Sequence, residues 1–196
     1  QPSPWNNDYG AFSLLPVTTG PVFDENERAS WFSHKAEIAT PYYYRVYLAE
    51  HDVVAEIAPT ERAAAFRLTY PEKDASYLVI DAYQHGSYVK VIPEKNMVIG
   101  YATNNHGGVP ENFRNWFVIV SDTPFETFSV IDGDNVAEGN EVAADHALAM
   151  VGFRTKRGQE VNLKVASSFI SAEQAELNLR ELDGKSFDDV KTACRD

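Results

Sequence analysis

The sequence consists largely of short segments in which apolar and polar residues alternate with a period of two. This period is that of a half-buried β-strand, because successive side chains of a strand point to opposite faces of the sheet. In the segment 42–48 (YYYRVYL), for example, Tyr44, Val46 and Leu48 share one face. Nine further segments fit a strand, namely 53–59, 62–71, 77–83, 87–93, 97–103, 115–121, 126–132, 147–153 and 160–169.

Turn-forming residues separate these segments, as at 71–74 (PEKD), 94–96 (EKN) and 132–135 (DGDN). The short link 49–52 predicts a hairpin between the segments 42–48 and 53–59. Many strands with short connections and no helical pattern between them predict a mainly β fold, an antiparallel β-sandwich.

Two segments allow sharper predictions about burial. The alternation in 62–71 sets Ala64, Phe66, Leu68 and Tyr70 inward, before Pro71 ends the strand. The segment 77–83 (YLVIDAY) is almost entirely apolar, which is typical of a central strand that is buried on both faces. By contrast, the polar stretch 21–41 predicts a long loop with one helical turn.

The pattern becomes helical at Ser171. Ser171 and Gln174 fit a capping box, and an apolar helical face follows it. Gly184 ends this helix, and Ser186 with Asp189 predicts the start of a second one. The members of the apolar faces are Ala172, Ala175, Leu179 and Leu182 in the first helix, and Val190 and Ala193 in the second. We therefore divide the chain into a β-sandwich domain, 1–170, and the start of a helical linker, 171–196, whose unfinished apolar face suggests further sequence.

Composition excludes some classes of function. The formal net charge of −12 disfavours a nucleic-acid partner, because phosphate binding needs a basic face. No apolar run is long enough for a membrane span, and no signal peptide is visible. The single cysteine, Cys194, cannot form an internal disulfide, and without a histidine partner it is a poor candidate nucleophile.

Several polar stretches are weak candidates for a site. The five histidines, His34, His51, His85, His106 and His146, lack the spacing of a zinc motif. The acidic stretch 132–141 fails the EF-hand template, so a solvated hairpin loop is the better interpretation. The loop 104–116 has no P-loop lysine, and Asn104, Asn105 and His106 are open to two interpretations, a polyol site or a surface crossover.

The strongest sugar-like cluster lies near the N-terminus, at Trp5, Asn6, Asn7 and Asp8. A flat aromatic face packs on the C–H side of a pyranose, while amides and carboxylates bond its hydroxyls. These residues are therefore our predicted substrate-binding residues. The alternative is that Trp5 only closes the end of the sandwich.

Three separated motifs, in order, resemble the N-terminal domain of glycoside hydrolase family 92, the calcium-dependent α-mannosidases. The first is the N-terminal segment 1–20, QPSPWNNDYGAFSLLPVTTG, which resembles the segment that leads into a D-Y-G-x-F-x-L-x-P strand. The third is 168–196, which resembles the family's exit into its linker helices. The second covers 29–71 and matches at Phe32, Ser33, His34, Glu37, Ala39, Pro41, Tyr43, Tyr44, Val46, Leu48, Thr60, Arg62, Phe66, Thr69, Tyr70 and Pro71.

The resemblance implies a galactose-mutarotase-like supersandwich that belongs to a larger exo-α-mannosidase. In the family a large (α/α)₆ domain is expected to follow the linker and to carry the general acid, the general base and most calcium ligands. The resemblance therefore implies no catalytic residue and no metal site in this chain, and one wall of a mannose pocket. It also implies a mannose-containing glycan, from N-glycans or mannans, as substrate, and a bacterial periplasmic or extracellular location. His34 and Glu37 belong to the second motif, with a structural role as the alternative to a functional one.

Two other hypotheses remain beside a mannosidase domain that is inactive alone. One is a free-standing carbohydrate-binding module, suggested by Trp5 to Asp8 and by the asparagine-rich loop. The other is a structural domain, suggested by the unfinished helical face, since such faces pack against a partner. Whether the chain is itself an enzyme is left open by the sequence.

Overall fold

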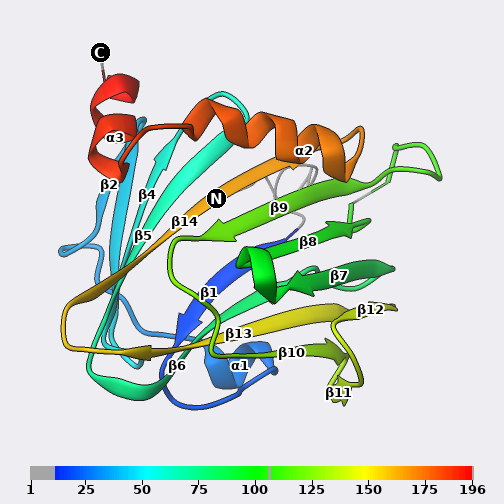
Figure 1. The fold of residues 1–196 in the computed structure, drawn as a ribbon, viewed down its shortest axis with the longest axis horizontal. Helices are drawn as coiled ribbons and strands as arrows, with labels where there is room; N and C mark the ends of the chain where they lie inside the picture. Colours follow the sequence, from blue (N-terminus) through cyan, green and yellow to red (C-terminus); the bar gives the residue numbers. More distant parts are fainter. Residues whose placement is uncertain (1–11, 106, 196) are drawn as a thin grey trace.

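Two antiparallel sheets form the body of the molecule in a computed structural model, which describes residues 12–105 and 107–195 (Figure 1). The five-stranded sheet has the order β1-β6-β13-β10-β11, with bounds Ser13–Val17, Lys73–Asp81, Ala147–Thr155, Thr127–Asp132 and Asn135–Ala137. The nine-stranded sheet has the order β12-β7-β8-β9-β14-β5-β4-β3-β2. Its bounds are Glu141–Ala144, Ser87–Ile92, Met97–Ala102, Asn115–Ser121, Gln159–Ser168, Ala63–Tyr70, Val53–Pro59, Tyr43–Leu48 and Ile38–Thr40. The predicted antiparallel β-sandwich is confirmed.

The main core lies between the two sheets and follows the period of two. In β6, Leu78 and Ile80 belong to this core, whereas Val79 between them packs on the opposite face with Leu148. Phe23, from the N-terminal loop, covers part of that opposite face. β6 is therefore buried on both faces, as its apolar sequence predicted.

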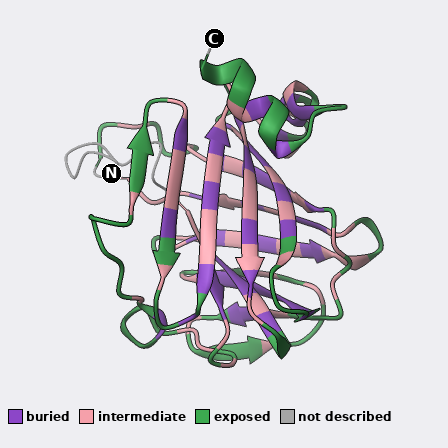
Figure 2. Cartoon of the chain, turned by 90° about the vertical axis from the view of Figure 1, so that its left-hand side faces the viewer, coloured by how far each residue is buried: buried purple, intermediate pink, exposed green. Residues whose placement is uncertain are grey.

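The hairpin of β3 and β4 has the predicted position. Leu48 pairs with Val53 at its end, and the four-residue link contains Asp52 in a left-handed conformation with φ of 51°. The banding of buried and half-buried residues along these strands is visible in Figure 2.

β5 differs in part from its prediction. Leu68 and Tyr70 are buried in the main core, as expected, and Phe66 packs against it. Ala64, however, is only half-buried, while Ala63 and Ala65 on the other face are buried at 7% exposure each. The reason is that the C-terminal helices cover the outer face of this sheet, so the strand has two buried faces rather than one.

Three helical elements follow β14: α2 (Ala172–Asn178), a 3-10 turn (Leu179–Leu182) and α3 (Phe187–Arg195). α2 lies over β14 and β9, and α3 over β4 and β5 (Figure 1). Of the predicted apolar face, Ala175, Leu179 and Leu182 are buried against the sheet, whereas Ala172 is only half-buried. These helices share a hydrophobic cluster with the nine-stranded sheet. The predicted domain boundary after residue 170 stays a prediction.

The two predicted helix starts are both present, with one difference. Ser186 and Asp189 cap each other, since the Asp189 amide donates to Ser186 Oγ and the Ser186 amide to Asp189 Oδ2. Ser171 accepts from the Gln174 amide, but the Gln174 side chain donates instead to Asn178, at 3.0 Å. The first capping box is therefore only half formed.

The apolar face of α3 also differs from the prediction. Val190 is buried, at 2% exposure, but Ala193 is exposed. Phe187, at the first position of the helix, supplies the second buried side chain, at 7% exposure. The face that contacts the sheet thus lies nearer the start of the helix than its sequence suggested.

The predicted loop at 21–41 contains the expected helical turn and one unexpected strand. α1 (Glu25–Arg28) is capped by Asp24, whose Oδ1 accepts from the amides of Asn26 and Glu27. The strand is β2, whose three residues are all exposed at the edge of the sheet. Within the described residues, no helix has the length and apolar character that a membrane crossing needs.

Candidate functional site

The predicted sugar-binding residues Trp5, Asn6, Asn7 and Asp8 lie outside the described residues. The first described residue, Phe12, comes soon after them in the chain. Its ring stacks on that of Phe117, which is fully buried on β9, with 4.4 Å between the centroids. Phe12 therefore anchors the start of β1 between the two sheets.

A groove of about 1010 Å³ opens beside Phe12. Its apolar lining comes from β1, β4, β5 and β14, through Phe12, Leu14, Ile57, Phe66 and Val165. The β4–β5 turn and α2 supply the polar lining residues, which include Thr60, Glu61, Arg62, Gln174 and Asn178. The groove has room for a small oligosaccharide.

The polar groups on this rim are largely engaged with one another. Glu181 accepts hydrogen bonds from Thr60 Oγ1 at 2.6 Å and from Arg62 Nε at 2.9 Å. Burial raises the pKa of the Glu181 carboxyl, but the hydrogen bonds from Thr60 and Arg62 outweigh it, and the pKa is lowered overall. Glu181 is thus held ionised and fastens the 3-10 turn after α2 to the β4–β5 turn.

The same is true of the amides at the mouth of the groove. Asn178 Nδ2 donates to the Ser167 carbonyl at 2.9 Å, and Gln174 donates to Asn178. These hydrogen bonds fix α2 on the end of β14.

Glu61 is the one carboxylate among the described residues that line the groove. Its side chain is 83% exposed and pairs with Arg62 at 3.1 Å. An inverting glycosidase needs two carboxyl groups on opposite sides of the sugar, one of them buried enough to stay protonated. The described groove does not supply that pair.

A second polar network fastens α3 to the sheet. Arg67 makes a bidentate pair with Glu56, at 2.8 and 3.0 Å, and its guanidinium lies over the Phe187 ring, 4.4 Å from the centroid. Tyr43 donates its hydroxyl to Glu56, and burial together with this bond raises the pKa of Tyr43 to about 12. Burial raises the pKa of Glu56, but the bonds from Arg67 and Tyr43 reverse this, and the pKa is lowered.

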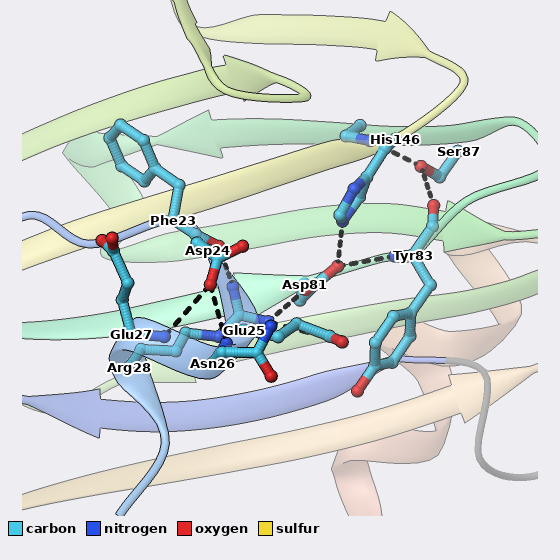
Figure 3. A network of polar contacts seen from close by, with 11 residues as sticks. Phe23, Asp24, Glu25, Asn26, Glu27, Arg28, Asp81, Tyr83, Ser87 and His146 are labelled. Carbon is cyan, nitrogen blue, oxygen red and sulfur yellow. Dashed lines mark hydrogen bonds and ion pairs between the residues drawn. The ribbon is translucent and has the colours of Figure 1, made fainter.

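A third network joins the N-terminal loop to the ends of β6 and β13 (Figure 3). Arg28 is 4% exposed and Asp81 1% exposed, and the guanidinium of Arg28 bonds Asp81 Oδ2 and the Phe23 carbonyl. Asp81 Oδ1 contacts His146 Nε2 at 2.8 Å and accepts from the Tyr83 amide at 2.7 Å. The network neutralises a carboxylate that the fold buries.

Asp81, His146 and Ser87 have the residue types of a hydrolase triad, but their bonds do not form one. Ser87 is 2% exposed, donates its hydroxyl to the Tyr83 carbonyl and accepts from the Ala147 amide. A nucleophilic serine must be open to substrate and bonded to the base. Ser87 instead holds the β6–β7 connection against β13.

The weaker candidates have structural roles or exposed positions. The side chain of Asn105 forms hydrogen bonds within its own loop. It donates to the Thr103 carbonyl and accepts from the Gly107 amide, each at 2.7 Å. The acidic stretch 132–141 covers the β10–β11 hairpin and the link to β12, and it is largely exposed. Across the described residues, no three His, Cys, Asp or Glu side chains come close enough to hold a metal ion.

His34 and Glu37 make the contacts of a structural tie. Glu37 accepts from the Tyr44 hydroxyl on β3 at 2.6 Å and contacts His34 Nδ1 at 2.7 Å. The side chain of His34 is 83% exposed. The pair joins the 21–41 loop to the sheet, as its structural interpretation expected, while a functional role remains untested.

The three buried or engaged networks were not anticipated from sequence. Asp81 gave the one signal in the sequence, because it is a charged residue inside an otherwise apolar strand. A charge that is buried in this way needs a partner that compensates it. The partner, Arg28, lies 53 positions away, so no local pattern identifies it.

Comparisons with known proteins agree with one another. A family model described as the glycosyl hydrolase family 92 N-terminal domain matches residues 1–168. The inverting mannosidase BT2199 of Bacteroides thetaiotaomicron, described as family GH92, is 35% identical, with a TM-score of 0.88 over 94% of this chain and 25% of that one. A family GH92 α-mannosidase of the same organism, BT3965, solved with mannoimidazole, is 27% identical, with a TM-score of 0.84 over 94% of this chain and 27% of that one.

The fold is also found outside the mannosidases. A bacterial glucoamylase complexed with acarbose shares the fold, with a TM-score of 0.56 at 8% identity over 93% of this chain and 30% of that one. A search of curated proteins found no match. The chain spans about a quarter of the length of the two mannosidases it resembles.

Proposed function

The chain belongs to glycosyl hydrolase family 92, as the N-terminal domain of that family, and we propose that it serves as one part of a longer, inverting exo-α-mannosidase. The observation that carries this proposal is the 35% identity to an inverting mannosidase over 94% of the chain, with only 25% of that relative covered. The substrate we propose is a mannose-bearing glycan, from N-glycans or mannans, outside the cytoplasm.

In this proposal the chain positions the sugar and the rest of the polypeptide performs the hydrolysis. The described groove carries a single, exposed carboxylate, which supports placing the acid and the base elsewhere. Those two groups would act from opposite faces of the sugar, one protonating the leaving oxygen and one activating water. This chain would contribute one wall of the mannose pocket through Trp5, Asn6, Asn7 and Asp8.

Among the described residues, no three His, Cys, Asp or Glu side chains lie close enough together to hold a metal ion. Hard cations such as calcium take six or more oxygen ligands. We propose that the calcium ligands, as the family resemblance suggests, come mostly from outside this chain.

The test compares this chain with a polypeptide that also carries the expected catalytic domain. We expect the 196-residue chain to leave an aryl α-mannoside intact, and the longer polypeptide to hydrolyse it with inversion, seen by NMR as initial release of the β-anomer. Turnover by the 196-residue chain alone, abolished by a chelator, would show that the catalytic residues lie within it. Initial release of the α-anomer by the longer polypeptide, with the configuration retained, would exclude the inverting mechanism.

A second candidate function is a free-standing carbohydrate-binding module. Trp5 with its neighbouring amides supports it, as does the exposed side chain of Trp31 beside the β3–β4 turn. Titration of the isolated chain and of its Trp5→Ala variant with mannobiose separates the two functions. A module built on Trp5 binds without a partner and loses that binding in the variant, whereas half a pocket shows no binding that depends on Trp5.

A further inference from the structure

An exposed tryptophan lies at the turn between β3 and β4. Trp31 is 78% exposed, the highest exposure of any large apolar side chain among the described residues. Its carbonyl accepts from the Ala49 amide at 2.9 Å, which sets it beside that turn. Tyr47, at 40% exposure, and the exposed carboxylates of Glu50 and Asp52 belong to the same turn. We call Ser30, Trp31, Tyr47, Glu50 and Asp52 the Trp31 surface.

Hydrogen bonds hold the backbone of Trp31 and the polar side chains of the Trp31 surface in place. Glu50 Oε2 accepts both the Trp31 amide and, at 2.9 Å, the Ser30 hydroxyl. The Tyr47 hydroxyl donates to Asp52 Oδ1 at 2.8 Å. A surface that is ordered before it meets a ligand loses less conformational entropy on binding.

The turn is also anchored in the protein interior. His51, between the two carboxylates, is 1% exposed, and its Nε2 contacts the Arg28 carbonyl at 2.9 Å. The Thr18 hydroxyl donates to the His51 carbonyl at 2.8 Å. The alternation of His51 inward with Glu50 and Asp52 outward therefore fixes where the two carboxylates point.

The chemistry of the Trp31 surface suits a neutral sugar. The indole offers a flat face for the C–H side of a pyranose. Within the described part of the chain, Glu50 uses one oxygen for both of its bonds and Asp52 uses Oδ1, so Glu50 Oε1 and Asp52 Oδ2 are available to sugar hydroxyls. The backbone hydrogen bond from Trp31 lowers the pKa of Glu50, so this carboxylate is an acceptor at neutral pH.

Other ligand classes fit less well. An anionic ligand would meet two carboxylates on a chain of net charge −12. An apolar polypeptide would have to desolvate both carboxylates without offering them partners, which costs more than the aromatic contacts return.

We propose that the Trp31 surface binds a neutral hexopyranose, a mannose-bearing glycan, at a site that does not require Trp5. The identity of the sugar as mannose rests on the proposed function, whereas the existence of the site rests on the Trp31 surface itself.

The experiment is calorimetric titration of the 196-residue chain with α-linked mannobiose, with cellobiose as a second probe. We expect wild-type chain and Trp5→Ala to bind mannobiose alike, and Trp31→Ala to lose about tenfold or more in affinity. Glu50→Gln and Asp52→Asn should each weaken binding severalfold, because they keep the turn but remove a charged acceptor. Val136→Ala, at a site 62% exposed on β11, is the matched control and should change nothing. Thermal unfolding of every variant checks that the fold is intact.

Three results would overturn or redirect the inference. Absence of mannobiose and cellobiose binding at millimolar concentration would overturn the inference. Trp31 and Tyr47 would then be candidates for a protein contact instead. Binding lost in Trp5→Ala but kept in Trp31→Ala would place the sugar at the N-terminal segment instead. Binding of cellobiose alone, lost in Trp31→Ala, would uphold the site and contradict the mannose specificity of the proposed function.

Discussion

The guanidinium of Arg28 and the carboxylate of Asp81 form a buried ion pair that joins the N-terminal loop to the end of β6. Their side chains are 5% and 1% exposed. Because Asp81 also binds His146 and the Tyr83 amide, one carboxylate connects three segments of the chain.

Arg28→Met is expected to lower the free energy of unfolding by about 3–5 kcal/mol, because it leaves the Asp81 charge buried with weaker compensation. Arg154→Met is the control, since Arg154 is 67% exposed and 3.8 Å from its partner Glu126, and should cost no more than about 0.5 kcal/mol. Urea unfolding followed by fluorescence measures both. Equal effects of the two substitutions would mean that the buried pair does not stabilise the fold.

Stability is expected to fall as acid protonates Glu56. The bonds from Arg67 and Tyr43 outweigh burial and set the pKa of Glu56 below its ordinary value of 4.5 in the folded state. A lowered folded pKa gives stability that is fully present above 4.5 and is lost as pH falls through the folded pKa. Urea unfolding across this range should show a smaller acid-induced loss in Glu56→Gln than in the wild type. An unchanged slope would place the acid sensitivity in other carboxylates.

Gly100→Ala is expected to destabilise the chain by about 3 kcal/mol through overpacking. A Cβ at Gly100 would lie 2.3 Å from the Tyr88 carbonyl oxygen and 2.5 Å from the Phe117 ring, so backbone would have to move. Gly108→Ala is a useful contrast, because its added Cβ meets nothing within 4 Å and only its positive φ of 80° is strained. Thermal unfolding of both variants measures the loss of stability. A smaller loss in Gly100→Ala than in Gly108→Ala would show that β8 relaxes easily around the added Cβ.

Phe187→Ala should loosen α3 without unfolding the sandwich. Phe187 is 7% exposed, stacks under Arg67 and lies edge-on to Tyr43, with 6.4 Å between the ring centroids. Truncating a buried phenylalanine costs about 3 kcal/mol or more, here concentrated at the helix that it anchors. Limited proteolysis and amide exchange should therefore increase in 187–195 but not in β6. Thr192→Ala, on the exposed face, is the control, and equal proteolysis of the two variants would argue against this anchoring.

Much of the fold could be predicted because the signals that specify it are local. The period of two located the longer strands from 42 to 169, and the serine caps located both C-terminal helices. The short strands Asn135–Ala137 and Glu141–Ala144 within that range were not predicted. The short edge strand Ile38–Thr40 was not found, because three exposed residues carry no alternation.

The features that could not be predicted depend on contacts between distant segments. Ala63 and Ala65 lie in one hydrophobic cluster with helices from the end of the chain, and in α3 it is Phe187 rather than Ala193 that is buried. The Arg28–Asp81 pair and the Trp31 surface likewise bring together residues that lie far apart in the sequence. Of the predicted site, Trp5 to Asp8 lie outside the described residues, so their role as sugar contacts stays a prediction.

The path of the chain from β11 to β12 has a consequence for how the sandwich moves. β11 belongs to the five-stranded sheet and β12 to the nine-stranded sheet, so only residues 138–140 separate strands of opposite layers. At the end of this crossover the Asn140 carbonyl accepts from the Val91 amide, and the Asn140 side chain donates to the Val91 carbonyl, at 2.8 and 2.9 Å. The two layers therefore cannot separate on this side without straining a three-residue tether. Slow amide exchange in β7 and β10 is accordingly expected to be correlated, with both strands opening in the same rare event although they lie in different sheets.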